Sequence, residues 1–257
     1  MPDPENSLAG IRVLVTRPMP QGLQTAEAIS RRGGTPVLFP VLEIQETDFL
    51  AELDATLSHL QDVDLAIMVS AAAVNSVSAR LRRSGNSIPE SVQVGVTGPA
   101  SASLCEKSGI SVNFVPEKRF DSEGLLECLS PYLDDIRSAV IFRGQSGREK
   151  LRTELEARGV QVRYQQCYRR TLTAQSIQPV LGVWREKGFD AVLVTSESTL
   201  DGLLQLLGSD GLALLRTSLV VAASNRIAEH CRQHDIERIS VAGNASENSL
   251  IAALEEI

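Results

Sequence analysis

Short apolar runs alternate with longer amphipathic stretches along the whole chain. Residues 11–16 form a β-branched run that predicts a strand, and residues 20–32 carry apolar side chains at helical spacing. Gly33-Gly34 ends this helix, and residues 36–40 begin a second strand. Apolar strands that alternate with helices are typical of parallel sheets covered on both faces. Further strands are expected at residues 65–70, 93–97, 112–115, 139–142, 161–164, 191–195, 219–222 and 238–241.

The two halves of the chain resemble each other at a constant offset. The block that ends at Ser70 matches the block that ends at Ser196, and residues 96–102 match residues 222–228, both 126 positions apart. Gly33 and Gly159 fall in the same register. Several blocks in one register indicate an ancient duplication. We therefore predict an α/β fold of two similar, doubly wound parallel-sheet domains.

Composition limits the function classes. The 257 residues suffice for two cores, and 43% hydrophobic with 22% charged residues is typical of a globular protein. Aromatic residues make up only 4% of the chain, too few for a protein that binds single-stranded nucleic acid by stacking on the bases. The net charge of −7 has the wrong sign for electrostatic binding of a phosphate backbone. The N-terminus shows no signal peptide and no run is long enough to span a membrane. Four widely spaced cysteines without a CxxC pair favour free thiols in the cytoplasm.

Common cofactor and nucleophile motifs are missing from the sequence. No GxGxxG follows the first strand, residues 144–150 lack the spacing of a phosphate loop, and no GxSxG elbow is present. His230 and His234 lie four residues apart, but no HExxH glutamate or third ligand is near, which favours a solvated helix face. We expect neither a metal nor a cofactor.

Hydroxyl, glycine and arginine residues follow several of the expected strands. In open parallel sheets the carboxyl ends of the strands line the ligand site, and bare amides and hydroxyls there suit carboxylate or phosphate groups. The alternative is that the hydroxyl side chains only cap the following helices, and both roles can hold together. The candidates are Thr16, Ser70, Thr97, Gly98, Arg143, Gly144, Ser196, Ser224 and Asn225.

Positive charge is concentrated in residues 137–170. This segment has nine basic and three acidic residues, a net +6 that leaves −13 for the rest of the chain. A solvated helix with i,i+4 pairs explains part of the excess. Arg143 directly follows a strand, and Arg169 and Arg170 lie in an extended segment, so we predict a positive wall that faces an anionic substrate.

Over nearly its whole length the chain resembles the uroporphyrinogen-III synthase family. The resemblance rests on an ordered set of pieces rather than on one motif, with Cys167-Tyr-Arg-Arg170 at the expected crossover between the domains. The other pieces are residues 13–18, 34–40, 70–74 and 94–102, Phe142-Arg-Gly144 with Gly147-Arg148, Thr195-Ser196 and residues 224–228.

The resemblance implies two domains joined by a two-stranded linker, with the active site in the cleft between them. One domain would comprise residues 1–39 and 172–257, the other residues 42–170, and residues 39–45 and 164–172 would cross between them. The implied reaction closes hydroxymethylbilane, a linear tetrapyrrole with acetate and propionate side chains, to uroporphyrinogen III with inversion of ring D. A transient hand-over from the enzyme that makes this substrate is a further implied partner.

The resemblance also assigns roles to side chains. Tyr168 matches the family's cleft tyrosine and would donate a proton to the leaving hydroxyl, although a purely structural role at the hinge is the alternative. Ser101 matches a cleft hydroxyl, and Arg17 joins Arg143 as a possible cationic contact. The chain departs from the family at Arg226-Ile227 and at Ala71-Ala72.

Two other functions fit a bilobal α/β chain. The first is a non-catalytic small-molecule sensor, but the export signal of periplasmic sensors and a DNA-binding module are both missing from the sequence. The second is a phosphosugar enzyme, for which no acid/base pair stands out. The resemblance therefore favours an enzyme of tetrapyrrole biosynthesis over both alternatives.

Overall fold

The computed structural model describes residues 6–145, 147 and 149–257. The chain divides into two compact units, one formed by residues 1–43 together with 171–257 and the other by residues 44–170. We call them unit 1 and unit 2. The chain passes between them twice, in strands β3 and β7, which are neighbours in one sheet. Arg148, one of the basic residues singled out above, lies outside the described residues.

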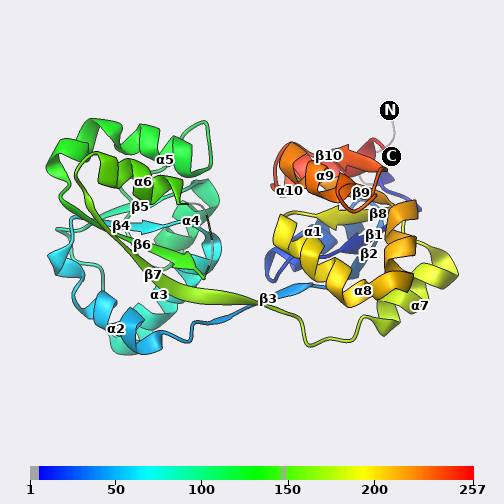
Figure 1. The fold of residues 1–257 in the computed structure, drawn as a ribbon, viewed down its shortest axis with the longest axis horizontal. Helices are drawn as coiled ribbons and strands as arrows, with labels where there is room; N and C mark the ends of the chain where they lie inside the picture. Colours follow the sequence, from blue (N-terminus) through cyan, green and yellow to red (C-terminus); the bar gives the residue numbers. More distant parts are fainter. Residues whose placement is uncertain (1–5, 146, 148) are drawn as a thin grey trace. The chain divides into compact units, whose positions relative to one another are not determined.

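Unit 1 contains a five-stranded sheet in the order β10-β9-β8-β1-β2, with helices on both faces (Figure 1). All strand pairs in this sheet are parallel, as the sequence predicts. Its elements are β1 (Arg12–Val15), α1 (Gln21–Ser30), β2 (Thr35–Leu38), α7 (Gln178–Lys187), β8 (Ala191–Val194), α8 (Glu197–Thr217), β9 (Leu219–Ala222), α9 (Asn225–Arg232), β10 (Ile239–Val241) and α10 (Glu247–Glu255).

Unit 2 is built on a second five-stranded sheet in the order β3-β7-β6-β4-β5. Helices again lie on both faces, α5 and α6 on one and α3 on the other (Figure 1). Its elements are β3 (Leu42–Glu46), α2 (Leu50–Ser58), η2 (Leu60–Asp62), β4 (Leu65–Met68), α3 (Ala71–Ser84), β5 (Gln93–Val96), α4 (Pro99–Lys107), α5 (Ser122–Leu129), η3 (Ser130–Asp135), β6 (Ser138–Gly144), α6 (Lys150–Ala157) and β7 (Gln161–Leu172), the first and last of which extend into unit 1.

The strand registers repeat at the offset seen in the sequence. Val13 pairs with Ala191 in unit 1, and the residues 126 positions away, Ala139 and Leu65, pair in unit 2. The pairing of β8 with β9 repeats in the same way as that of β4 with β5. Four strands of each sheet, β9-β8-β1-β2 and β5-β4-β6-β7, thus share order and register, as a duplicated chain should.

Alternation along the strands divides the interior of unit 2 into two cores. Ala66 and Met68 of β4 pack with the helix α2–α4 side, while Leu65 and Ile67 pack with the α5–α6 side. Successive side chains of a strand point to opposite faces of the sheet, so a central strand needs apolar residues at every position. All four residues of β4 are accordingly buried.

The prediction of a strand at residues 112–115 is wrong, because this segment forms only one isolated β-bridge, between Phe114 and Gly95 of β5. Its counterpart in unit 1 is the complete strand β10, where the Val220 amide donates to the Arg238 carbonyl. In unit 2 the equivalent amide, of Val94, donates instead to the side-chain oxygen of Asn113 at 2.8 Å. A side-chain acceptor thus replaces one backbone acceptor of the ladder, while the Val96 amide still donates to the Phe114 carbonyl at 3.0 Å.

Helix α7 contains a glycine whose substitution should stabilise unit 1. Gly182 lies in the interior of the helix, and a Cβ added there would meet nothing within 4 Å. We expect Gly182→Ala to raise the free energy of unfolding by about 0.5–1 kcal/mol, because alanine loses less backbone entropy on entering a helix. Denaturant unfolding measures it, and a neutral or destabilising change contradicts the prediction.

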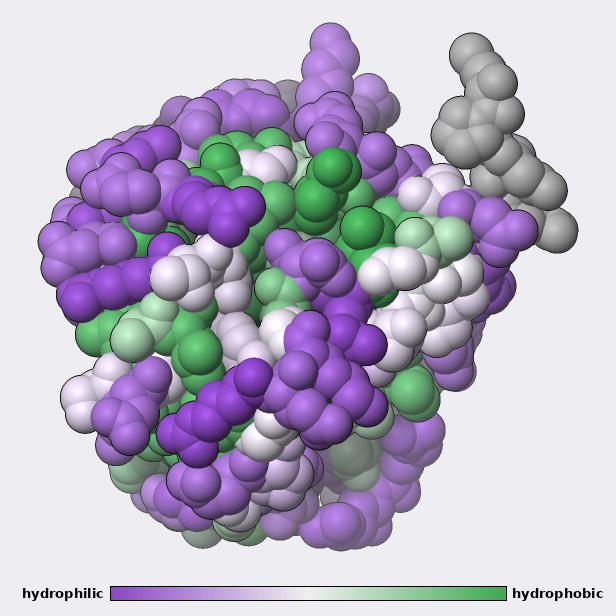
Figure 2. All heavy atoms as spheres, turned by 90° about the vertical axis from the view of Figure 1, so that its right-hand side faces the viewer, coloured by the Kyte–Doolittle hydropathy of each residue, from purple (hydrophilic) through white to green (hydrophobic). Residues whose placement is uncertain are grey.

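Hydrophilic and hydrophobic residues are interspersed on the face of the protein that Figure 2 shows. The face drawn in Figure 2 is a mosaic in which hydrophilic residues predominate and hydrophobic residues show between them. Among the described residues, no helix is both long enough and apolar enough to cross a membrane.

Candidate functional site

Unit 2 contains a pocket of about 210 Å³ at the carboxyl ends of β4 and β6. Both strands end in residues that the sequence analysis selected, Ser70 after β4 and Arg143-Gly144 in β6. The position is the one expected for a ligand site in an open parallel sheet. The lining residues are Val69, Ser70, Ser122, Ile141, Arg143, Gly144, Gly147, Leu151, Tyr164, Tyr168 and Arg170.

An irregularity in β7 aims Tyr168 into this pocket. Arg143 pairs with Gln166, but the next residue of β6, Gly144, pairs with Tyr168, so Cys167 is an extra residue in β7. Neighbouring side chains of a regular strand point to opposite faces, whereas Cys167 and Tyr168 are both buried and belong to the same core. Such bulges re-aim side chains and are frequent beside active sites.

The Tyr168 hydroxyl is the polar centre of the pocket. Ser70 Oγ donates to the phenolic oxygen at 3.2 Å, and Arg170 Nη2 donates to it at 3.4 Å. Ser70 also caps α3, since its Oγ accepts from the Ala73 amide at 3.1 Å. Because two donors occupy the phenolic oxygen, the hydroxyl proton remains available to a group inside the pocket.

Close packing fixes the ring of Tyr168. A Cβ added at Gly144 would lie 2.9 Å from both Cε2 and Cζ of Tyr168. Real Cβ atoms are never so close to a ring carbon, so only glycine leaves room for the ring at this point of β6. Gly144 therefore has a positional role in the pocket.

Arg143 forms the second polar group of the pocket. Its side chain is only 10% exposed, pairs with Glu149 at 2.9 Å, and stacks on the Tyr164 ring at 4.3 Å from the centroid. The guanidinium hydrogen bond is the main cause that lowers the pKa of Glu149. Burial and then the nearby Glu149 carboxylate raise the pKa of Tyr164, which keeps this phenol neutral.

The basic segment contributes less free positive charge than its sequence suggests. Arg169 pairs with Asp48 at 3.3 Å, Arg152 with Glu156 at 2.7 Å and Lys150 with Glu123 at 3.2 Å. Of these pairs only Arg152–Glu156 is the i,i+4 helix pair of the alternative interpretation, and the other two use acidic residues from outside the segment. Arg170 is exposed, lines the pocket and has no carboxylate within 4.0 Å among the described residues.

Three other predicted residues of unit 2 are not among those that line the pocket. The Thr97 hydroxyl donates to the Val69 carbonyl at 3.2 Å, linking β5 to the end of β4. Gly98 precedes α4, where a Cβ would lie 3.1 Å from Phe120 Cβ, and Ser101 is buried in the first turn of α4.

The predicted residues of unit 1 lie at the equivalent strand ends. Thr16 is fully buried and its hydroxyl donates to the Leu193 carbonyl, so it ties β1 to β8. Arg17, the counterpart of Arg143, donates to Thr25 Oγ1 at 2.9 Å and to the Ala245 carbonyl at 3.0 Å, and burial lowers its pKa. Ser196 and Ser224 cap α8 and α9, and Asn225 is the exposed first residue of α9.

The sequence analysis did not select Tyr164 or Ser122, and it named Arg170 only as part of the positive wall. Tyr164 packs against the core on the α5–α6 side of the sheet, whereas Tyr168 belongs to the opposite core. The extra residue Cys167 breaks the alternation between them, so period-2 spacing does not connect the two tyrosines. Ser122 opens α5 after a long irregular segment, and no spacing rule connects it to β6.

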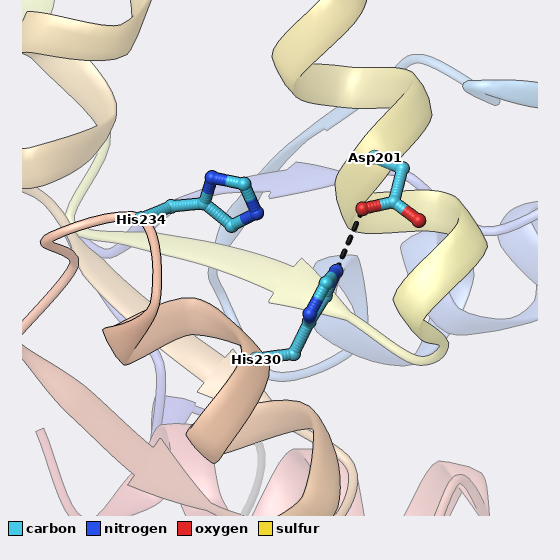
Figure 3. Close-up of side chains that lie close together, drawn as sticks. All are labelled: Asp201, His230 and His234. Atoms are coloured by element: carbon cyan, nitrogen blue, oxygen red, sulfur yellow. Dashed lines mark hydrogen bonds and ion pairs between the residues drawn. The ribbon is translucent and has the colours of Figure 1, made fainter.

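A second cluster of chemistry-bearing side chains lies in unit 1. His230 of α9 binds Asp201 of α8 through Nε2 and Oδ1 at 2.7 Å, and His234 follows in the turn after α9 (Figure 3). One ligand atom of each of the three residues lies within 4.8 Å of those of the other two. The inference that no third ligand is near the histidines is therefore wrong, because Asp201 comes from another helix, 29 residues earlier.

Asp201 should make His230 titrate above its usual range. The hydrogen bond to this carboxylate is the main cause that raises the pKa of His230 from 6.5. The interaction stabilises the fold fully below pH 6.5 and loses its effect as the pH rises through the elevated value. We expect Asp201→Asn to lower the pKa of His230 in an NMR titration. An identical His230 titration in both proteins would contradict this.

Comparisons with known proteins agree with the resemblance in the sequence. The family described as uroporphyrinogen-III synthase HemD matches residues 24–252. The uroporphyrinogen-III synthase of Salmonella typhimurium is 32% identical over 95% of this chain and 99% of its own length, and that of Escherichia coli is 30% identical over the same shares.

Solved structures share the fold. A mutant uroporphyrinogen III synthase from Thermus thermophilus aligns with a TM-score of 0.62 at 18% identity, covering 96% of this chain and all of its own. The synthetase of Helicobacter pylori aligns with a TM-score of 0.62 at 15% identity, covering 94% of this chain and 96% of its own.

Proposed function

The chain belongs to the uroporphyrinogen-III synthase family, and from that premise we propose that the pocket of unit 2 holds part of the family's linear tetrapyrrole substrate. The enzyme is of the lyase type. It cyclises hydroxymethylbilane to uroporphyrinogen III and inverts ring D through a spiro intermediate. The alternative of a non-catalytic sensor is not favoured, because both bacterial relatives named above are synthases that match over nearly their whole length.

The reaction needs few chemical groups from the protein. Loss of the terminal hydroxyl as water gives an electrophilic azafulvene, the substituted carbon of ring D attacks it, and the spiro intermediate fragments and recloses. Without control of the chain's conformation, closure gives the uninverted type I isomer. The main task is therefore to hold one conformation of a flexible substrate, together with one proton transfer that makes hydroxyl a leaving group.

Tyr168 is the proposed proton donor. The observation that supports this role most strongly is the pair of hydrogen bonds that Ser70 and Arg170 donate to its oxygen, which leaves its proton free for the substrate. The same two donors stabilise the negative charge that develops on the oxygen as the proton departs. Because water is the only by-product, the substrate must return a proton to Tyr168 before the next turnover.

Arg170 should bind a substrate carboxylate. It is the exposed cation of the pocket without a carboxylate partner among the described residues, whereas Arg143 already pairs with Glu149. We expect Arg170→Gln to raise KM by about tenfold or more, as for loss of a charge-assisted hydrogen bond. Arg163→Gln, on the same strand but outside the pocket, should leave KM unchanged. Equal KM values for both variants would exclude the assignment.

The deciding experiment is a coupled assay that starts from hydroxymethylbilane and separates the product isomers. We expect type III product at a rate proportional to the concentration of this protein. Type I product alone, at the uncatalysed rate, would overturn the proposal.

We also propose that the enzyme works in the cytoplasm and takes its substrate by transient hand-over from the enzyme that makes it, without binding nucleic acid or membranes. Four free cysteines, three of them buried, support a reducing compartment. Hydroxymethylbilane that is free in solution can close without the enzyme to the type I isomer, which favours a direct hand-over.

A further inference from the structure

The cluster of Asp201, His230 and His234 has the composition of a metal site. Two imidazoles and one carboxylate, on two helices and a turn, converge with their ligand atoms within 4.8 Å of one another. The two imidazole rings meet edge to face, with centroids 5.2 Å apart (Figure 3). We propose that these three residues of unit 1 bind a divalent transition metal ion of the zinc type, which joins α8 to α9.

The geometry needs only small adjustments to close around an ion. Zinc bonds of about 2.0–2.1 Å in a tetrahedral arrangement place ligand atoms about 3.3 Å apart. The Oδ1 of Asp201 and the Nε2 of His230 are 2.7 Å apart and would separate slightly, and His234 would move inward. The Asp201 side chain is 59% exposed, so its rotation meets little resistance. Three protein ligands leave a position for water.

Groups around the cluster orient the ligands. Gln233 Oε1 lies 3.3 Å from Nδ1 of His230, and an acceptor at that nitrogen holds the tautomer that presents Nε2 to an ion. Arg216, near the end of α8, donates to the His234 carbonyl at 3.1 Å and pairs with Asp235 at 2.6 Å. The turn that carries His234 is thereby held to the C-terminal part of α8, while Asp201 lies in the N-terminal part, before the non-helical Gly208.

The donor set selects the class of cation. Imidazole nitrogen suits zinc, nickel, copper and cobalt, whereas magnesium and calcium prefer oxygen ligands alone. The buried thiols Cys105, Cys167 and Cys231 are poor competitors, because burial raises their pKa to about 11 or 12 and a thiol binds metal as its thiolate.

The test is calorimetric titration of the full, chelator-treated chain with Zn²⁺ and, separately, with Mg²⁺. We expect one Zn²⁺ per chain, no measurable binding of Mg²⁺, and a rise in the melting temperature with Zn²⁺ alone. His230→Gln and His234→Gln should each weaken Zn²⁺ binding at least tenfold, and Gln233→Ala about tenfold. His59→Gln, which removes the chain's third histidine, is the matched control and should bind like the original protein.

Other outcomes would overturn the assignment. Zn²⁺ affinity in His230→Gln and His234→Gln equal to that of His59→Gln would place any bound ion elsewhere, and the lack of a saturable heat would exclude a site. Melting curves without metal check that each variant is folded. Should a histidine variant fail to fold, Asp201→Asn carries the same expectation. Co²⁺ provides a second readout, because its visible absorption bands should weaken in the same variants.

Discussion

Replacing Tyr168 with phenylalanine should slow formation of uroporphyrinogen III by about 10²-fold or more, the usual contribution of a positioned proton donor. Tyr168→Phe keeps the ring against Gly144 and removes only the hydroxyl, so the strand and its bulge should stay intact. Ser70 and Arg170 then lose their shared acceptor, and the leaving hydroxyl must take its proton from water. The isomer-resolved assay measures the loss, and unfolding curves report whether the fold persists.

The matched control is Tyr132→Phe. Tyr132 lies in η3, is 49% exposed, contacts the Phe114 ring at a tilt, and is not among the residues that line the pocket. It should keep the original rate. A Tyr168→Phe enzyme with an unchanged rate would reduce Tyr168 to a packing residue, whereas a loss of both rate and folding would favour a hinge role.

Pattern alone predicts the sheets well, because a central strand in a parallel sheet must be apolar on both faces. Residues 65–68 and 191–194 satisfy that demand and form β4 and β8. The same reasoning fails at residues 112–115, where one side-chain amide, that of Asn113, takes the acceptor position of a ladder carbonyl. The pattern of apolar and polar residues does not show whether a backbone amide donates to a strand carbonyl or to a side-chain oxygen.

The pocket is only partly predictable for a different reason. Ser70, Arg143 and Gly144 follow from the rule that ligands bind at the carboxyl ends of parallel strands. Tyr168 depends on an extra residue in β7, and no spacing in the sequence marks that bulge, so only the family resemblance pointed to it. Asp201 and His230 meet because α8 packs on α9, a contact between elements that a linear motif does not contain.

Gly144→Ala should impair catalysis through Tyr168 itself. The new methyl group would lie 2.9 Å from Cε2 and Cζ of the ring, while β6 holds the backbone of Gly144 in register with Tyr168. The ring must swing away, which carries the hydroxyl from its two donors and from the pocket. We expect about a 10²-fold loss of rate and a destabilisation of about 1–3 kcal/mol from overpacking. Gly182→Ala, in open space on α7, is the control and should keep full activity.

A double mutant separates this explanation from a general loss of structure. If Gly144 affects catalysis only by positioning the Tyr168 hydroxyl, then Gly144→Ala should have no further effect on the rate of an enzyme that already lacks this hydroxyl. Adding Gly144→Ala to Tyr168→Phe should then cost no more than about threefold in rate, although the ring carbons still clash and the destabilisation remains. Rate losses that multiply to about 10⁴-fold would show that Gly144 supports catalysis independently of the tyrosine.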